Sequence, residues 1–292
     1  MPAIDIDSIR AAVTRAGVTG LRVETVAETG STNRVLMEAP FGDGPASPRL
    51  LAAARQTAGR GRQGRGWVME PGRSAAFSIA VERLANRGRP AIGLSIAAGV
   101  AVAGALAEMC EALASGRGLD RGIALKWPND LQRAGSKIGG ILVESRRAPV
   151  GGAQGERYVV GIGLNLLAPR DEAGAIGQPA AGLFDGDALP VPAEEVVGRV
   201  AAAVVDAAGL FFREGLTAFA DGWHRFDALR GRQVAALVDG RSESVGIARG
   251  IDADGALLLD TAAGLKAVRA GEVSVRAVAD RQPLAESRAP AR

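Results

Sequence analysis

The most distinctive segment of the chain is Arg55-Gln-Thr-Ala-Gly-Arg-Gly-Arg-Gln-Gly-Arg-Gly-Trp67, which follows a strand-like apolar run at 50–54. Its glycines let the backbone approach a ligand closely. Its arginines, spaced between those glycines, offer fixed groups of donors to carboxylate or phosphate oxygens. No acidic residue lies between Asp43 and Glu70. The segment therefore predicts an anion-binding loop, with an Arg-Gly nucleic-acid segment or a solvated loop as open alternatives.

Two further segments carry lysines. One, Lys126-Trp-Pro-Asn-Asp130, ends a predicted strand, and the other, Lys137-Ile-Gly-Gly-Ile-Leu-Val-Glu144, opens one. Apart from these two lysines and Lys266, every one of the 35 Lys+Arg residues is Arg. Positions 126 and 137 are therefore predicted to need a compact ammonium group, with two surface lysines by chance as the open alternative. Asn129 and Asp130 could hold a metal–phosphate unit or a ribose, or could cap a turn, and both interpretations stay open.

Composition excludes several classes of protein. With 292 residues, 47% hydrophobic and 23% charged, the chain is typical of a globular protein. A net charge of +3 is small for a protein that coats nucleic acid. Cys110 and His224, each the only residue of its type, exclude a disulfide framework and a Cys/His zinc site. The N-terminus shows no secretion signal, and the small-residue run at 91–107 favours a core helix over a membrane span, so we expect a cytoplasmic protein.

Hydrophobic patterning divides the chain into two domains. Residues 1–228 predict an α+β domain with a mixed β-sheet. Its helices are expected at 4–16, 31–37, 90–115 and 194–223, and its strands at 21–27, 50–54, 75–81, 123–126, 138–144 and 158–165. Residues 229–277 predict a small all-β domain with strands at 234–238, 244–251, 256–259 and 264–268. The remaining residues, 278–292, have the composition of a disordered tail.

The predicted site combines many cations, close-approach glycines and an Asn-Asp pair without a nucleophile. This combination suits the attack of a carboxylate on the α-phosphate of ATP, because the main task of such an enzyme is to neutralise and align two anions. The loop is not a P-loop, since Gly-x-x-x-x-Gly-Lys-Ser/Thr is absent. We therefore predict adenylation of a small carboxylic acid.

The sequence resembles the biotin–protein ligases, also called biotin–[acetyl-CoA-carboxylase] ligases, over about residues 24–168. The matching motifs are Gly30-Ser-Thr-Asn33, Gln56 with 59–65 and Trp67, 126–130, 137–144 and Gly161-Ile-Gly-Leu-Asn165. Segments 250–255 and 271–276 resemble the SH3-like domain of the family. The resemblance implies a class II synthetase-like catalytic domain, shared with lipoate ligases, and a small SH3-like β-barrel at the C-terminus.

The resemblance also implies roles for individual residues. Biotin would be held by Ser31, Thr32, Asn33, Gln56, the backbone near Gly139 and Gly140, and a loop containing Gly59, Arg60, Gly61 and Arg62. Lys137 and Arg62 would act on the biotin carboxylate and the α-phosphate. Trp67 would flank the adenine, and the nucleotide side would also include Arg65, Lys126, Asn129, Asp130 and Asn165. Mg²⁺ would accompany ATP without an all-protein cage.

The implied reaction transfers biotin to a lysine of a biotin carboxyl carrier domain of acetyl-CoA carboxylase or a related carboxylase. Family members dimerise through sheet edges, but no residue here decides whether this chain forms a homodimer. Gln63 stands where the commonest family pattern has a second arginine. Only 30 residues precede Ser31, so we expect no DNA-binding domain and no repressor role. The alternatives are a lipoate- or octanoate-type ligase and, in a different class, a nucleic-acid-binding protein.

Overall fold

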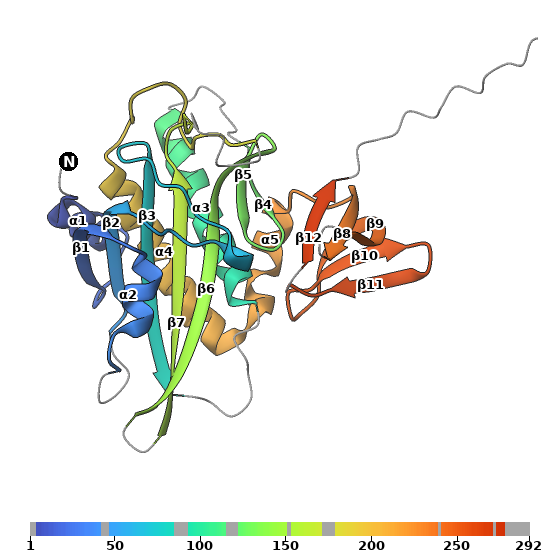
Figure 1. Ribbon diagram of the computed structural model, residues 1–292, viewed down its shortest axis with the longest axis horizontal. Helices are drawn as coiled ribbons and strands as arrows, with labels where there is room; N and C mark the ends of the chain where they lie inside the picture. Colours follow the sequence, from blue (N-terminus) through green and yellow to red (C-terminus); the bar gives the residue numbers. More distant parts are fainter. Residues whose placement is uncertain are drawn as a thin grey trace, which may run out of the picture. The chain divides into compact units, whose positions relative to one another are not determined.

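The computed structural model describes residues 4–41, 47–84, 93–114, 122–150, 153–170, 179–238, 241–270 and 273–277. The chain forms two compact units (Figure 1). The first consists of Met1–Ala228 with Ala253–Gly255, and the second of Leu229–Asp252 with Ala256–Arg292. The predicted disordered tail at 278–292 lies outside the described residues.

A seven-stranded sheet organises the first unit, in the order β1-β2-β3-β7-β6-β5-β4. Its strands are β1 (Arg22–Thr29), β2 (Arg49–Gln56), β3 (Ser74–Leu84), β4 (Ile123–Lys126), β5 (Asp130–Arg133), β6 (Ser136–Val150) and β7 (Ala153–Asn165). β1 and β2 are parallel, whereas all other neighbours are antiparallel. The predicted mixed sheet with helices is confirmed.

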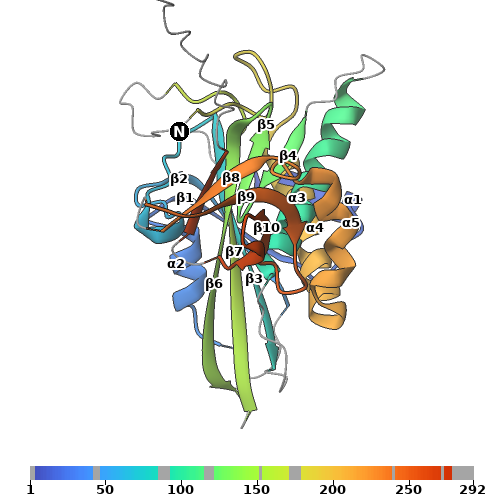
Figure 2. The same cartoon turned by 90° about the vertical axis from the view of Figure 1, so that its right-hand side faces the viewer.

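Helices cover the two faces of this sheet unequally (Figure 2). Its helices are α1 (Ile6–Arg15), α2 (Thr32–Glu38), α3 (Leu94–Ala114), α4 (Ala193–Glu214) and α5 (Ala220–Phe226). The short helix α2 lies on one face, and the other four lie on the opposite face, where α4 contacts α1, α3 and β3. Among the described helices of this unit, α2 is thus the one that packs on its face of the sheet. Helix α3 is long and apolar enough to span a membrane by length and composition, with 50% of its apolar window buried inside the structure.

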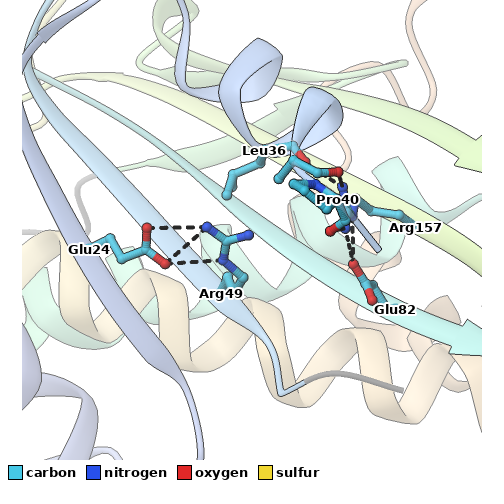
Figure 3. A network of polar contacts seen from close by, with 7 residues as sticks. Glu24, Leu36, Pro40, Arg49, Glu82 and Arg157 are labelled. Carbon is cyan, nitrogen blue, oxygen red and sulfur yellow. Dashed lines mark hydrogen bonds and ion pairs between the residues drawn. The ribbon is translucent and has the colours of Figure 1, made fainter. Parts of the chain in front are cut away.

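An arginine inside the first unit holds the C-terminal end of α2 (Figure 3). Arg157 of β7 is 1% exposed and donates to the carbonyl oxygens of Leu36 (2.9 Å), Ala39 (2.5 Å) and Pro40 (2.7 Å). Its Nε also donates to Glu82 of β3 at 2.6 Å. Leu36 O belongs to the last turn of α2, where carbonyls lack intrahelical partners, and Ala39 and Pro40 directly follow the helix. Arg157 therefore fixes α2 to the sheet.

The structure differs from the sequence expectation at one helix and at one strand of the first unit. The helix expected over 194–223 is interrupted at Gly215, whose φ of 80° belongs to the left-handed region, and it continues as a 3₁₀ turn and α5. The four-residue strand β5 was not expected, because Asp130-Leu-Gln-Arg133 has little strand propensity and pairs through its neighbours β4 and β6. Ser31 occupies the N-cap of α2 but makes no side-chain capping bond.

The second unit is an antiparallel five-stranded sheet in the order β11-β10-β9-β8-β12. Its strands are β8 (Gln233–Val238), β9 (Arg241–Ile251), β10 (Leu257–Thr261), β11 (Gly264–Val268) and β12 (Val273–Ala277). The predicted small all-β module is confirmed, although β12 was not expected as a strand. The sequence pair Asp239-Gly240 is a hairpin-turn signal between the first two strands, and it lies outside the described residues.

Candidate functional site

Neutral polar side chains gather at the first turn of α2, against the sheet. Gln56 Oε1 accepts from the backbone N of Thr32 at 2.7 Å and from its hydroxyl at 3.0 Å. The Thr32 hydroxyl also lies 2.7 Å from Ser78 Oγ, which donates to Asn33 Oδ1 at 2.6 Å. Ser31, Thr32 and Asn33 are each at most 4% exposed. Four predicted residues are thus brought together, and each buried polar group has a defined orientation.

Two glycines of β7 leave room for site side chains on the same face of the sheet. A Cβ at Gly161 would overlap the amide of Asn33, and a Cβ at Gly163 would overlap the ring of Trp67. Since residues two apart in a strand share a face, Asn33 and Trp67 lie on neighbouring parts of the α2 side. The indole Nε1 of Trp67 is buried without a hydrogen-bond partner among the described residues.

The glycine–arginine segment folds back on itself as a tight loop. Within it, Trp67 N donates to Gly59 O at 2.9 Å, and Gly61 N donates to Arg65 O at 2.7 Å. At its tip Gln63 has a φ of 56°, and its side-chain oxygen accepts from Arg65 Nη2 at 2.7 Å. The residue that departs from the family pattern therefore holds a loop arginine by accepting a hydrogen bond rather than by adding a charge.

The two central arginines of the loop reach different elements, β6 and the turn between β4 and β5. Arg60 forms an ion pair with Glu144 of β6 at 3.3 Å, whereas Arg62 Nη1 donates to Asn129 Oδ1 at 3.4 Å. Burial, followed by the nearby charge of Arg65, lowers the pKa of Arg62 from its ordinary value, and Asp130 opposes that shift. Arg62 nevertheless stays charged at neutral pH. The loop therefore presents partly desolvated positive charge, which suits an anionic ligand.

Lys137 of β6 forms an ion pair with an acidic residue of the neighbouring strand β5. Its Nζ lies 2.5 Å from Asp130 Oδ1. Asp130 is opposite Gly140 in β6 and opposite Lys126 in β4, so these positions share a face of the sheet. Gly140 is opposite Gly163, which places this charged group on the α2 side beside Trp67. The register thus joins the lysine motifs to the glycine–arginine loop.

Three other predicted residues, Asn129, Asn165 and Gly139, lie in the strands and turns that form the site. Asn129 donates to Ile141 O at 2.8 Å while its own oxygen accepts from Arg62, so it both closes a turn and faces the loop. Asn165 is 7% exposed at the end of β7. At Gly139 a side chain would point to the opposite face, since a Cβ there would lie 2.6 Å from Gly163 O and beside Leu131. Only its backbone is available to the site.

Sequence reasoning missed Ser78 and Glu144, and it gave no role to Gly161 and Gly163. Ser78 is 0% exposed in a strand whose other buried residues, apart from Ser74 at its start, are apolar, and Glu144 ends the apolar run of β6. A polar residue within or directly after an apolar strand sequence is the signal that could have indicated these two positions. Among the described residues, no group of three or more His, Cys, Asp or Glu side chains could hold a metal ion.

Comparison with known proteins gives consistent matches. Residues 26–165 match the Biotin/lipoate A/B protein ligase family, and residues 230–276 match the Biotin protein ligase C terminal domain. A Paracoccus denitrificans biotin–[acetyl-CoA-carboxylase] ligase is 35% identical, covering 85% of this chain and 98% of that protein. The Mycobacterium tuberculosis protein of the same name is 31% identical, covering 93% and 96%.

Among solved structures, the Aquifex aeolicus biotin protein ligase in complex with biotin and ATP has a TM-score of 0.66. It is 27% identical and covers 88% of this chain and 99% of that one. The fold and the sequence matches together define a protein ligase with an appended β-domain. The chain belongs to the biotin/lipoate protein ligases, within the group of enzymes named biotin–[acetyl-CoA-carboxylase] ligase.

Proposed function

We propose that this enzyme activates biotin with ATP to biotinyl-5'-AMP and then transfers biotin to a lysine of a biotin carboxyl carrier domain. One observation carries the proposal. The neutral polar group around Thr32 and the cationic group around Lys137 lie on the same face of the sheet, where Trp67 lies against Gly163. A ligand with a neutral polar ring at one end and a carboxylate at the other matches this arrangement.

The polar group at α2 is suited to a urea-like ring. Gln56, Ser78 and Asn33 hold their hydrogen-bonding atoms in fixed positions, and such preorganised groups discriminate strongly against an analogue that lacks the matching donors or acceptors. Lipoate and octanoate have no such ring. The site therefore favours biotin over these acids.

Lys137 and Arg62 are proposed to act where the two anions meet. The biotin carboxylate oxygen attacks the α-phosphorus of ATP, the bond from that phosphorus to the bridging oxygen breaks, and pyrophosphate leaves. Positive charge held in place lowers the repulsion between carboxylate and phosphate and stabilises the charge that develops on the phosphoryl oxygens. The buried part of Arg62 makes that interaction stronger than it would be in water.

ATP is expected to enter with Mg²⁺, which neutralises phosphate charge. Asp130 and the side-chain oxygen of Asn129 are hard ligands of the kind that Mg²⁺ prefers, and both lie next to Lys137 and Arg62. They fit a metal ion held mainly by the nucleotide. Trp67, Arg65, Lys126 and Asn165 are proposed to line the nucleotide side.

In the second step the amine of an acceptor lysine attacks the carbonyl carbon of the adenylate. A new C–N bond forms, AMP leaves with the bonding electron pair, and the amine loses its proton to solvent or a base. A closed loop protects the mixed anhydride from water until the acceptor arrives. The names of the two relatives matched over nearly their whole length support a carboxylase carrier domain as the acceptor.

The decisive experiment is acyl-adenylate formation, measured by mass spectrometry with ATP and Mg²⁺ and with biotin, lipoate or octanoate as the acid. We expect biotinyl-AMP with biotin alone, and then a mass shift of one biotin on a purified carrier domain. An adenylate of lipoate or octanoate but not of biotin would contradict the proposal, as would the absence of any adenylate from folded protein.

We also propose a ligase without a repressor role. The two relatives matched over 96% and 98% of their length are named as ligases only. Binding of the biotinyl-AMP-loaded protein to DNA upstream of biotin genes, measured against a scrambled duplex, checks this point. Sequence-specific binding at physiological salt would overturn it.

A further inference from the structure

Glu144 connects two parts of the site through the two oxygens of one carboxylate. Its Oε1 lies 3.3 Å from Arg60 Nη1 at the start of the loop, and its Oε2 accepts from Asn33 Nδ2 of α2 at 2.9 Å. Glu144 is opposite Val159 in β7 and therefore faces α2. Its side chain is 23% exposed, which leaves the carboxylate partly desolvated between its two partners.

The Asn33 end of this connection is rigid. Asn33 Oδ1 accepts from Ser78 Oγ at 2.6 Å, and Ser78 is completely buried. The same serine contacts Thr32, which in turn is held by Gln56. A continuous polar network thus extends from the site of the proposed biotin ring to Glu144. The carboxylate is fixed by α2, so Arg60 is the partner that can leave.

Arg60 is the more mobile of the two partners of Glu144, because its side chain is exposed and glycines flank it. Arg60 has a side chain that is 49% exposed, and it stands between Gly59 and Gly61. Glycines on both sides leave the backbone with many accessible conformations, so the loop needs contacts to hold it down. The neighbouring cation Arg62 reaches Asn129 instead. Within the part of the chain that the structure describes, the ion pair with Glu144 is the contact that ties the charge of Arg60 to the sheet.

We propose that Glu144 is a positioning residue that docks the glycine–arginine loop onto α2. One oxygen holds Asn33 for the acid substrate, and the other holds Arg60, so that the loop stays closed over the activated acid. The inference rests on the proposed function for its substrate, although the docking itself depends only on the contacts above. It predicts that loss of the negative charge affects retention of the adenylate more than binding of biotin.

The test uses two substitutions at one position. Glu144→Gln keeps an oxygen that accepts from Asn33 but removes the charge that holds Arg60, whereas Glu144→Ala removes both. For Glu144→Gln we expect release of biotinyl-AMP into solution to rise about fivefold, the equivalent of a partly exposed ion pair, with little change in the KM for biotin. For Glu144→Ala we expect the KM for biotin to rise as well.

Two control variants distinguish the loss of loop docking from the effect of removing any surface carboxylate. Glu28→Gln removes a carboxylate that pairs with Arg55 at 2.8 Å on the exposed ends of β1 and β2, and it should leave adenylate release unchanged. The double variant Arg60→Ala/Glu144→Gln should release adenylate no faster than Arg60→Ala, because both changes remove the same contact. Additive effects would overturn the proposal.

A second measurement does not depend on activity. Trypsin needs a locally unfolded segment for cleavage, so a loop that undocks more often should be cut faster after its arginines. Glu144→Gln should therefore be cleaved in the loop about fivefold faster than wild type at unchanged global stability. If the wild type forms biotinyl-AMP and Glu144→Gln changes neither loop cleavage nor adenylate release, the docking role is overturned. Faster cleavage in a protein that forms no adenylate would support the docking role and contradict the proposed function instead.

Discussion

The ammonium group of Lys137 lies 2.5 Å from the carboxylate of Asp130, across the neighbouring strands β5 and β6. Both side chains are about one-fifth exposed, at 20% and 21%. An incoming carboxylate or phosphate must therefore compete with Asp130 for the lysine. This contact orients the lysine, and the proposed reaction needs its positive charge where the carboxylate and the phosphate meet.

The first prediction concerns this lysine. Lys137→Ala should lower the rate of biotinyl-AMP formation about 100- to 1000-fold, the usual cost of removing one preorganised group that stabilises developing charge. Single-turnover mass spectrometry measures the rate. Lys266→Ala is the matched control, because Lys266 lies in the second unit and donates to Ser244 at 2.6 Å. A normal rate of adenylate formation in Lys137→Ala would remove Lys137 from its central role.

The second prediction concerns the space beside Asn33. Gly161→Ala places a Cβ on the amide of Asn33 and should raise the KM for biotin about tenfold, because an overpacked side chain must move from its position. Gly104→Ala is the control: no atom lies within 4 Å of its added Cβ, and in the interior of α3 the change should stabilise the fold. An unchanged KM in folded Gly161→Ala would show that Asn33 does not contact biotin.

The parts of the site that were predicted from sequence are those whose signals are local. Arginines between glycines, and two of three lysines beside strand ends, identify a polyanion site within a few residues. Ser78 and Glu144 act through partners that are 45 and 111 positions away, so no local pattern reveals them. Strand β5 could not be predicted for the same reason, because its pairing with β4 and β6 outweighs the weak strand propensity of its own residues. What sequence could not supply was the register that places these residues on one face.

The third prediction concerns the stability of α2. Arg157→Met should lower the free energy of unfolding by about 3–5 kcal/mol, because it leaves Glu82 and three helix-end carbonyls without their buried partner. The opposite residue in β6, Arg146, also donates to α2, at Met37 O, but it is exposed. Arg146→Met should cost less than about 1 kcal/mol. Urea denaturation measures both, and equal losses would refute the special role of Arg157.

The fourth prediction concerns acid stability and Glu156. Burial would raise the pKa of this carboxyl, but hydrogen bonds from Tyr158 and Arg83, the charge of Arg83 and a bond from Arg147 lower it below its ordinary value of 4.5. A carboxyl whose pKa is lower in the folded state stabilises the fold above about pH 4.5, and this contribution is lost as the pH falls through the folded-state value. Wild type should therefore exceed Glu156→Gln in unfolding free energy at neutral pH, and the gap should shrink below about pH 4.5.

Urea denaturation from neutral pH down to about pH 3 checks the shape of that difference. Glu111→Gln is the control, because its carboxylate is 66% exposed and lies 3.7 Å from Arg225. That substitution should leave the acid limb of the stability curve unchanged. The sign follows from the direction of the shift: a folded-state pKa above the ordinary value would make the gap grow toward acid. A gap that stays constant from neutral to acid pH would mean that Glu156 titrates alike in the folded and unfolded states, and that its three partners do not stabilise its charge.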